Sequence, residues 1–169
     1  EKFGYDYSVN PQNEIVLWTI RFPRIILALL VGAGLSVAGC AFQSLFSNPL
    51  ATPDTLGVAS GTSFGAALGI LMGFSLIGIQ FSALLFGIIA VSLTYLSGTG
   101  KGHSMNTIVL AGIMIGSLFS ALVSFTKFVA DSESQLPAIT YWLMGSLSSA
   151  SYKTLMLGAP FIIVGIFVL

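Results

Sequence analysis

The chain has 169 residues, and charged residues make up only 7% of them, with six Lys and Arg balancing six Asp and Glu. A soluble domain carries about 25% charged residues, so this composition excludes an ordinary soluble fold. Apolar residues reach 55% and the mean hydropathy is +0.95, which predicts an all-α integral membrane protein. The balanced charge also offers no basic surface for nucleic acid.

The first twenty residues are mixed and partly polar. Asn10 and Pro11 form a suitable N-cap and first-turn pair for a helix. Ile15, Trp18 and Ile20 follow at spacings that favour a helix lying along the membrane surface, with Trp18 at headgroup depth. The sequence therefore predicts one short interfacial helix before the first span.

One span is expected before, and another after, a turn bracketed by prolines, NPLATPD. The stretch Ile25–Pro53 carries no charge, and the spans are expected at about 25–46 and 56–73. Glycine recurs every four residues through the second span. This spacing places the glycines on one stripe of a helix, which favours close packing against another helix, and lining of a substrate path is the alternative. The glycines are Gly57, Gly61, Gly65, Gly69 and Gly73.

A third span is expected at about 77–97, followed by the loop SGTGKGHS. This loop is only superficially similar to a phosphate-binding loop, because the motif GxxxxGK requires glycine at the position of Tyr95. Lys101 and His103 are therefore interpreted as solvated loop residues.

The fourth span is expected at about 106–127, and it is rich in small and hydroxyl residues. These residues either pack against another helix or line a polar path, and the sequence leaves both open; Gly112, Gly116 and Ser120 are the candidates for the path. The segment 131–151 is too polar to span, and a short helix is expected at 136–147. A fifth span at 152–169 is expected to be truncated, so that residues 1–169 form a single transmembrane fragment.

No ionisable side chain falls in the middle of a predicted span. Ion-coupled transporters usually hold such groups at depth, and an intramembrane enzyme needs acid–base groups or an activated nucleophile. The sequence thus predicts a transport subunit that is not an enzyme, has no cofactor or metal site, and is driven by a partner. Cys40 is expected to be a small buried apolar residue.

Four motifs resemble the membrane subunit of the ABC importers for iron-siderophores, haem and cobalamin. They are RFPR at 21–24, GAGLSVAGCAFQSLFSNPLATPDTLGVASG at 32–61, VLAGI at 109–113 and YWLMGSLSSASY at 141–152. The resemblance implies a ten-helix permease of a prokaryotic inner membrane, and the five spans would be its helices two to six. It also implies a permease homodimer or paired homologous half, two cytoplasmic ATPase subunits and an external substrate-binding protein.

The resemblance gives Arg21 and Arg24 a role in docking, because arginines at these family positions meet acidic residues of the binding protein. Anchoring to lipid headgroups is the alternative from the residues alone. Counting spans puts both arginines on the same side as Lys127 and Lys153, and the positive-inside rule would make that side cytoplasmic. The family places it outside, and the expectation follows the family.

The resemblance also implies a cytoplasmic gate near the proline-bracketed turn and at the start of the fourth span. The alternative for the turn is that its prolines only cap two helices. The residues at the gate positions are Asn48, Leu50, Ser104, Met105 and Asn106.

The sequence thus predicts the permease subunit of an ATP-driven importer for a metal chelate, working by alternating access with its pore at a dimer interface. One rival is an ion-coupled secondary transporter with a broken helix at NPLATP. Another is a truncated membrane protein that does not transport.

Overall fold

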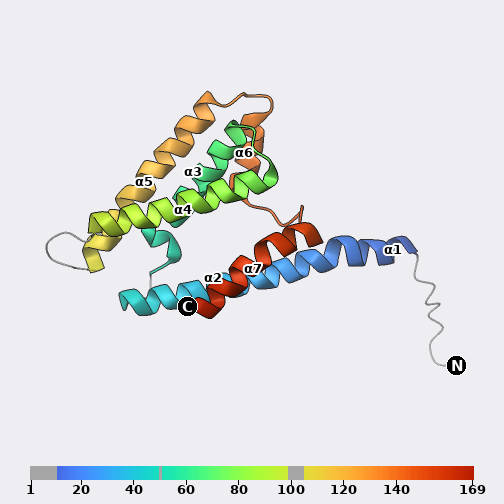
Figure 1. Cartoon of the computed structure of the whole chain (residues 1–169), viewed down its shortest axis with the longest axis horizontal. Coiled ribbons are helices and arrows are strands. Elements are labelled where there is room, and N and C mark those ends of the chain that lie inside the picture. Colours follow the sequence, from blue (N-terminus) through green and yellow to red (C-terminus); the bar gives the residue numbers. More distant parts are fainter. Residues whose placement is uncertain (1–10, 50, 99–104) are drawn as a thin grey trace. The chain divides into compact units, whose positions relative to one another are not determined.

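The computed structural model describes residues 11–49, 51–98 and 105–169, and all regular structure in these ranges is helical (Figure 1). The predicted all-α membrane fold is confirmed. Seven α-helices and two short turns of other helix types follow one another along these described ranges. They are α1 (Pro11–Val16), the π-helical turn η1 (Leu17–Arg21), α2 (Phe22–Phe46), the 3-10 turn η2 (Pro53–Leu56), α3 (Val58–Leu71), α4 (Leu76–Gly98), α5 (Met105–Val129), α6 (Gln135–Met144) and α7 (Tyr152–Val168).

Three helical stretches of the described chain are long and apolar enough to cross a membrane: Gln12–Phe46, Leu76–Gly98 and Asn106–Val129. The helices α3 and α7 are apolar but shorter. At 1.5 Å per residue α3 is about 21 Å long, less than the roughly 30 Å of a hydrocarbon core. It is shorter than the predicted second span because Gly57 and Gly73 adopt positive φ angles of 73° and 70°, which end the α-helix on both sides.

The first helix is continuous through α1, η1 and α2, so the short helix expected before Arg21 is the beginning of a longer one. Pro23 has no N–H, and in an α-helix its ring would clash with the carbonyl four residues earlier. In the π-helical turn the N–H of Phe22 donates to the carbonyl of Leu17, five residues back. This turn widens the helix just before the proline and lets it continue.

The chain divides into two compact units. The first unit contains residues 1–38 and 146–169, so its described helices are α1, η1, the first part of α2, and α7. Within it α7 lies beside α2 (Figure 1), where a Cβ atom on Gly34 would come within 3.0 Å of Ile162. The side chain of Pro23 is fully buried.

The second unit, Gly39–Gly145, is built around α3. Its helices α4 and α5 both pack against α3, and α6 contacts it as well. One phenylalanine from each of α3, α4 and α5 meets the other two. The ring centroid of Phe64 lies 4.9 Å from that of Phe86 and 5.8 Å from that of Phe119, and the centroids of Phe86 and Phe119 are 6.4 Å apart. These tilted and edge-on contacts join the three helices.

Cys40 is exposed, so its predicted burial is wrong. Many large apolar side chains of the helices are exposed too, among them Leu29, Leu85 and Phe125. A membrane helix turns apolar side chains toward lipid as readily as toward protein, so hydropathy alone does not identify its buried face.

A hydrogen-bonded turn joins α5 to α6. A carboxylate oxygen of Asp131 accepts from the N–H of Ser134 at 2.9 Å and from its hydroxyl at 2.7 Å. Mainly the hydroxyl contact, and then the N–H, holds the pKa of Asp131 below its ordinary value. The side chain of Gln135 then donates to the carbonyl of Leu71 at 3.1 Å, which fixes the start of α6 against the end of α3.

Candidate functional site

The glycines in the middle of α3 bring its backbone into direct contact with α4. A Cβ atom on Gly61 would lie 2.6 Å from the Cβ of Ala90, and one on Gly65 would collide with the carbonyl of Ser82. The hydroxyl of Ser82 donates to the carbonyl of Gly65 at 2.7 Å. A Cβ on Gly69 would approach the backbone of Ile79 to 3.3 Å. Small residues therefore let these two helices approach closely along most of α3.

The glycines at the two ends of α3 have other surroundings. A Cβ atom on Gly57 would lie 2.9 Å from the backbone nitrogen of Gly116, so this residue faces α5. A Cβ atom on Gly73 would meet no atom of the described residues within 4 Å, and the positive φ of Gly73 places it in the turn after α3. The regular spacing of the five glycines thus corresponds to three different environments.

The η2 turn is held between α4 and α5. Thr94 of α4 is fully buried, and its hydroxyl donates to the carbonyl of Leu56 at 3.0 Å. On the other side, a Cβ atom on Gly112 would collide with the carbonyl of Thr55. Within the turn, the Thr52 N–H donates to the Thr55 hydroxyl at 3.1 Å. Irregular backbone in a membrane protein needs such partners, and here they hold the turn firmly.

The three residues predicted to line the path differ in exposure. Gly112 is buried against η2, Gly116 is half-buried next to Gly57, and Ser120 is exposed. The hydroxyl of Ser120 donates to that of Ser60 on α3 at 3.3 Å. Ser120 is therefore the path candidate with the most open surroundings, while the two glycines pack on neighbouring backbone.

The predicted gate residues lie in two places. Asn48 is exposed in the turn after α2, where its N–H donates to the carbonyl of Gln43 and the N–H of Ser47 donates to Ser44. This pair of bonds is a Schellman motif, and it requires the positive φ of 48° at Ser47. Asn106 is exposed in the first turn of α5. Leu50, Ser104 and the side chain of Met105 lie outside the described residues.

The two arginines predicted to dock a partner have different environments. Arg21 is exposed at the end of η1. Arg24 is half-buried, and its Nη2 donates to the carbonyl of Ser148 at 2.9 Å. The structure therefore gives Arg24 a contact within the chain, to the segment that precedes α7.

A second contact joins the start of α7 to the π-helical turn. The hydroxyl of Tyr152 donates to the carbonyl of Trp18 at 2.9 Å. In the π-helical register this carbonyl would accept from residue 23, which is a proline without an N–H. Tyr152 thus supplies the donor that Pro23 lacks.

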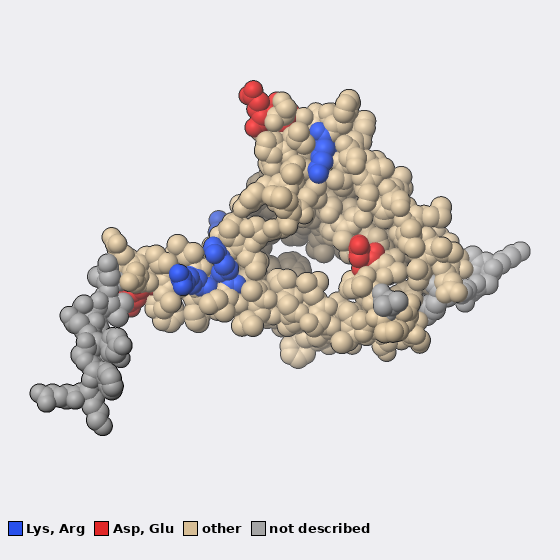
Figure 2. Space-filling model, turned by 180° about the vertical axis from the view of Figure 1, so that it is seen from behind, with Lys and Arg blue, Asp and Glu red and all other residues tan. Residues whose placement is uncertain are grey.

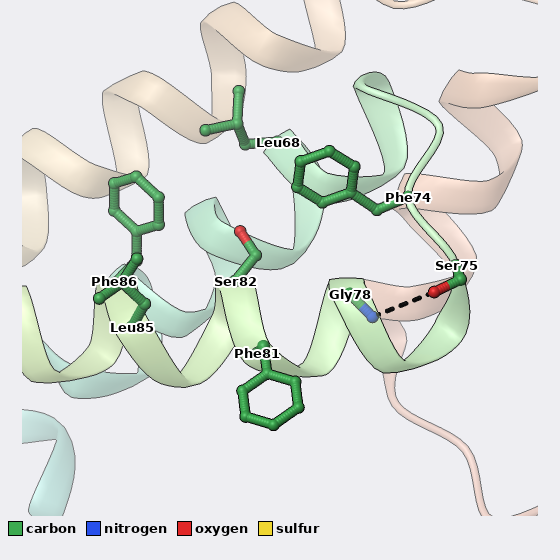
Figure 3. Close-up of a pocket in the computed structure, with 8 residues that line it drawn as sticks. All are labelled: Leu68, Phe74, Ser75, Gly78, Phe81, Ser82, Leu85 and Phe86. Carbon is green, nitrogen blue, oxygen red and sulfur yellow. Dashed lines mark hydrogen bonds between the residues drawn. The ribbon is translucent and has the colours of Figure 1, made fainter.

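A shallow apolar groove of about 690 Å³ lies on the α3–α4 side of the second unit (Figure 3). Its lining contains no ionisable side chain, and its Ser82 hydroxyl already binds the Gly65 carbonyl. Phe81 points away from the space that Leu68 and Phe74 border in Figure 3. The groove offers a surface for apolar contact and no group for catalysis.

The FecCD transport family matches residues 3–169, which is nearly the whole chain. The chain belongs to this family. The resemblance inferred from the four motifs is therefore confirmed. Three curated permeases of the family illustrate its range of substrates.

The chain is 40% identical over 158 residues to the molybdate import permease MolB of Haemophilus influenzae, covering 92% of this chain and 47% of that protein. It is 36% identical over 165 residues to the hemin transport permease HmuU of Yersinia pestis, covering 94% of this chain and 49% of that protein. It is 34% identical over 161 residues to the cobalamin import permease BtuC of Halobacterium salinarum, covering 94% of this chain and 43% of that protein. The chain thus spans about half the length of these relatives.

A solved inward-facing structure assigned to the metal-chelate type of ABC transporter has the same fold. The TM-score is 0.85 at 38% identity, covering 94% of this chain and 51% of that one. Membership of the FecCD family makes the chain a multi-pass protein of a prokaryotic cell membrane and a permease segment that is not an enzyme, as predicted.

Sequence reasoning missed the residues that hold backbone carbonyls in this FecCD-family chain: Thr94, Ser82 and Tyr152. The polar Thr94 near the end of an apolar helix was an available signal, because a buried hydroxyl needs a partner. Pro23 within a helix was another, because it leaves one carbonyl without its donor. Neither signal identifies the residue at the other end of the hydrogen bond. For Thr94 that residue is Leu56, 38 positions earlier in the chain.

Proposed function

We propose that this FecCD-family chain is part of the membrane permease of an ATP-driven importer and that the substrate is a metal chelate. The observation that carries the proposal is the likeness, at a TM-score of 0.85 over 94% of the chain, to a structure assigned to the metal-chelate type of transporter. The relatives that import hemin and cobalamin, which are both metal chelates, support the same substrate class.

The proposed mechanism is alternating access, with the pore at the interface of two permease copies or homologous halves. ATP hydrolysis in two cytoplasmic ATPase subunits would move the gates, and an external binding protein would deliver the substrate. Asn48 and Leu50 would form one part of the cytoplasmic gate, and Ser104–Asn106 the other. Asn48 in the turn after α2 and Asn106 in the first turn of α5 are both exposed at helix ends, which supports this assignment of the gate.

In the same proposal Ser120 marks the surface nearest the path, together with Gly112 and Gly116. Its exposure and its hydrogen bond to Ser60 support a polar surface shared by α3 and α5. Arg21 and Arg24 belong to the outer face that meets the binding protein.

Molybdate is the second candidate substrate, because the molybdate permease MolB is 40% identical over 92% of this chain. An oxyanion and a large metal chelate differ in size and charge, so one experiment separates them. The binding protein encoded beside the full-length permease is titrated calorimetrically with a ferric siderophore, hemin, cobalamin and molybdate. Binding of one of the chelates supports the proposal, and binding of molybdate alone overturns its substrate class.

A further inference from the structure

Arg21 and Arg24 lie three residues apart in the sequence, yet Arg21 is exposed while Arg24 is half-buried and bonded to the carbonyl of Ser148. We propose that Arg24 is a positioning residue that holds the segment 146–151 in place. Arg21 and Lys153, which are both exposed in the same unit, then form the face that receives a carboxylate-rich partner. The inference rests on the proposed function, in which that partner is the external substrate-binding protein.

The guanidinium of Arg24 is held within the chain along its Nε–Nη2 edge. Its Nη2 donates to the carbonyl of Ser148 at 2.9 Å, and its Nε is buried without a hydrogen-bond partner among the described residues. A carboxylate that binds an arginine side-on needs Nε and Nη2 together. That edge of Arg24 is closed to a carboxylate from outside, whereas Arg21 is exposed.

The segment 146–151 has no helix of its own and depends on a few hydrogen bonds. The hydroxyl of Ser146 donates to that of Ser148 at 2.7 Å and accepts from its N–H at 3.0 Å. Ser151 caps α7 through the N–H of Thr154 at 3.3 Å. These bonds shape the segment locally, and the Arg24 side chain ties its middle to α2.

The segment is exposed from Ser146 to Ser149, and so are Arg21 and Lys153 of the same unit. The described part of this unit holds three cations, Arg21, Arg24 and Lys153, against one carboxylate, Glu14. Figure 2 shows the Lys and Arg side chains of this unit gathered on one stretch of its surface. Excess positive charge on an exposed surface fits an acidic protein surface, and such complementarity speeds association.

The test uses the full-length permease with Cys40→Ser and a nitroxide on Ser149→Cys. Arg24→Ala is expected to raise the mobility of the label, while Arg21→Ala and Lys153→Ala leave it unchanged. The association rate with the binding protein at low salt is expected to fall roughly three- to tenfold in each of the three variants. For Arg24→Ala the cause is loss of the segment's position, so restoring the position restores the rate.

Restoration is tested by linking Arg24→Cys to Ser148→Cys with a short bifunctional thiol reagent. A linked variant that associates at the rate of the parent protein supports positioning by Arg24. A linked variant as slow as Arg24→Ala, or a label that Arg24→Ala leaves unchanged, overturns it. If the parent protein does not bind the binding protein at all, the proposed function fails, while the label mobility still decides whether Arg24 holds the segment.

Discussion

At the scale of single residues, polar side chains stabilise this fold by supplying donors to carbonyl oxygens. Thr94 donates to Leu56, and Tyr152 donates to the carbonyl that Pro23 leaves without an N–H. Gln135 donates to Leu71 where α3 ends. Hydrogen bonds between elements of membrane proteins contribute modestly, about 0.6 kcal/mol on average and up to about 1.7.

The bond from Thr94 is a direct test of this role. Thr94→Val keeps the shape of the side chain but removes the donor, so the free energy of unfolding is expected to fall by about 1 to 2 kcal/mol. Thr94→Ser, which keeps a hydroxyl, is the control and is expected to lose less. Steric trapping in bicelles measures both, and a Val variant as stable as the parent protein would contradict the assignment.

The turn at Asp131 is expected to respond only to strong acid. Because the pKa of Asp131 is lowered by Ser134, the ionised carboxylate stabilises the folded turn. This stabilisation is complete above the ordinary pKa of 3.8 and is lost as the pH falls through the lower value of the folded protein. An NMR titration of the Ser134 amide proton checks the midpoint.

Ser134→Ala is the matched control for this titration, since it removes the hydroxyl that is the main cause of the shift. The midpoint of Asp131 is expected to move upward in this variant. A midpoint at or above 3.8 in the unchanged protein would show that the carboxylate is not held by the turn.

At the scale of elements, the contact of α3 with α4 depends on the absence of side chains. Gly65→Ala is expected to force the helices apart and to cost about 1 to 3 kcal/mol of unfolding free energy. Gly32→Ala on α2 is the control, because its added methyl group would meet no atom of the described residues within 4 Å, apart from its own helix backbone and chain neighbours. It gains helix propensity without a clash, so no loss is expected. Equal effects of the two substitutions in steric trapping would refute close packing at Gly65.

The ends and continuity of the helices were less predictable than their existence. Apolar runs without charge predicted the all-helical membrane fold, because a bilayer leaves few other ways to satisfy the backbone. The short length of α3 depends on positive φ angles at Gly57 and Gly73. Glycine permits such angles but does not require them, so the sequence does not predict them. The continuity of the first helix depends on a π-helical turn that accommodates Pro23.

At the scale of the whole molecule, motifs predicted family membership, but they did not predict what each motif residue contacts. RFPR gave no sign that Arg24 binds the carbonyl of a residue 124 positions away. The substrate also stayed open, because the residues predicted to line the path, Gly112, Gly116 and Ser120, carry no charge that selects one ligand. Relatives of similar identity import molybdate, hemin and cobalamin.

ATP-driven import is tested by measuring uptake into proteoliposomes. The full-length permease is reconstituted with its ATPase subunits, and the loaded binding protein is supplied on the opposite face with labelled substrate. Uptake is expected to require MgATP on the ATPase side and to persist when proton and sodium gradients are collapsed. Uptake that follows either gradient without ATP would contradict ATP-driven import.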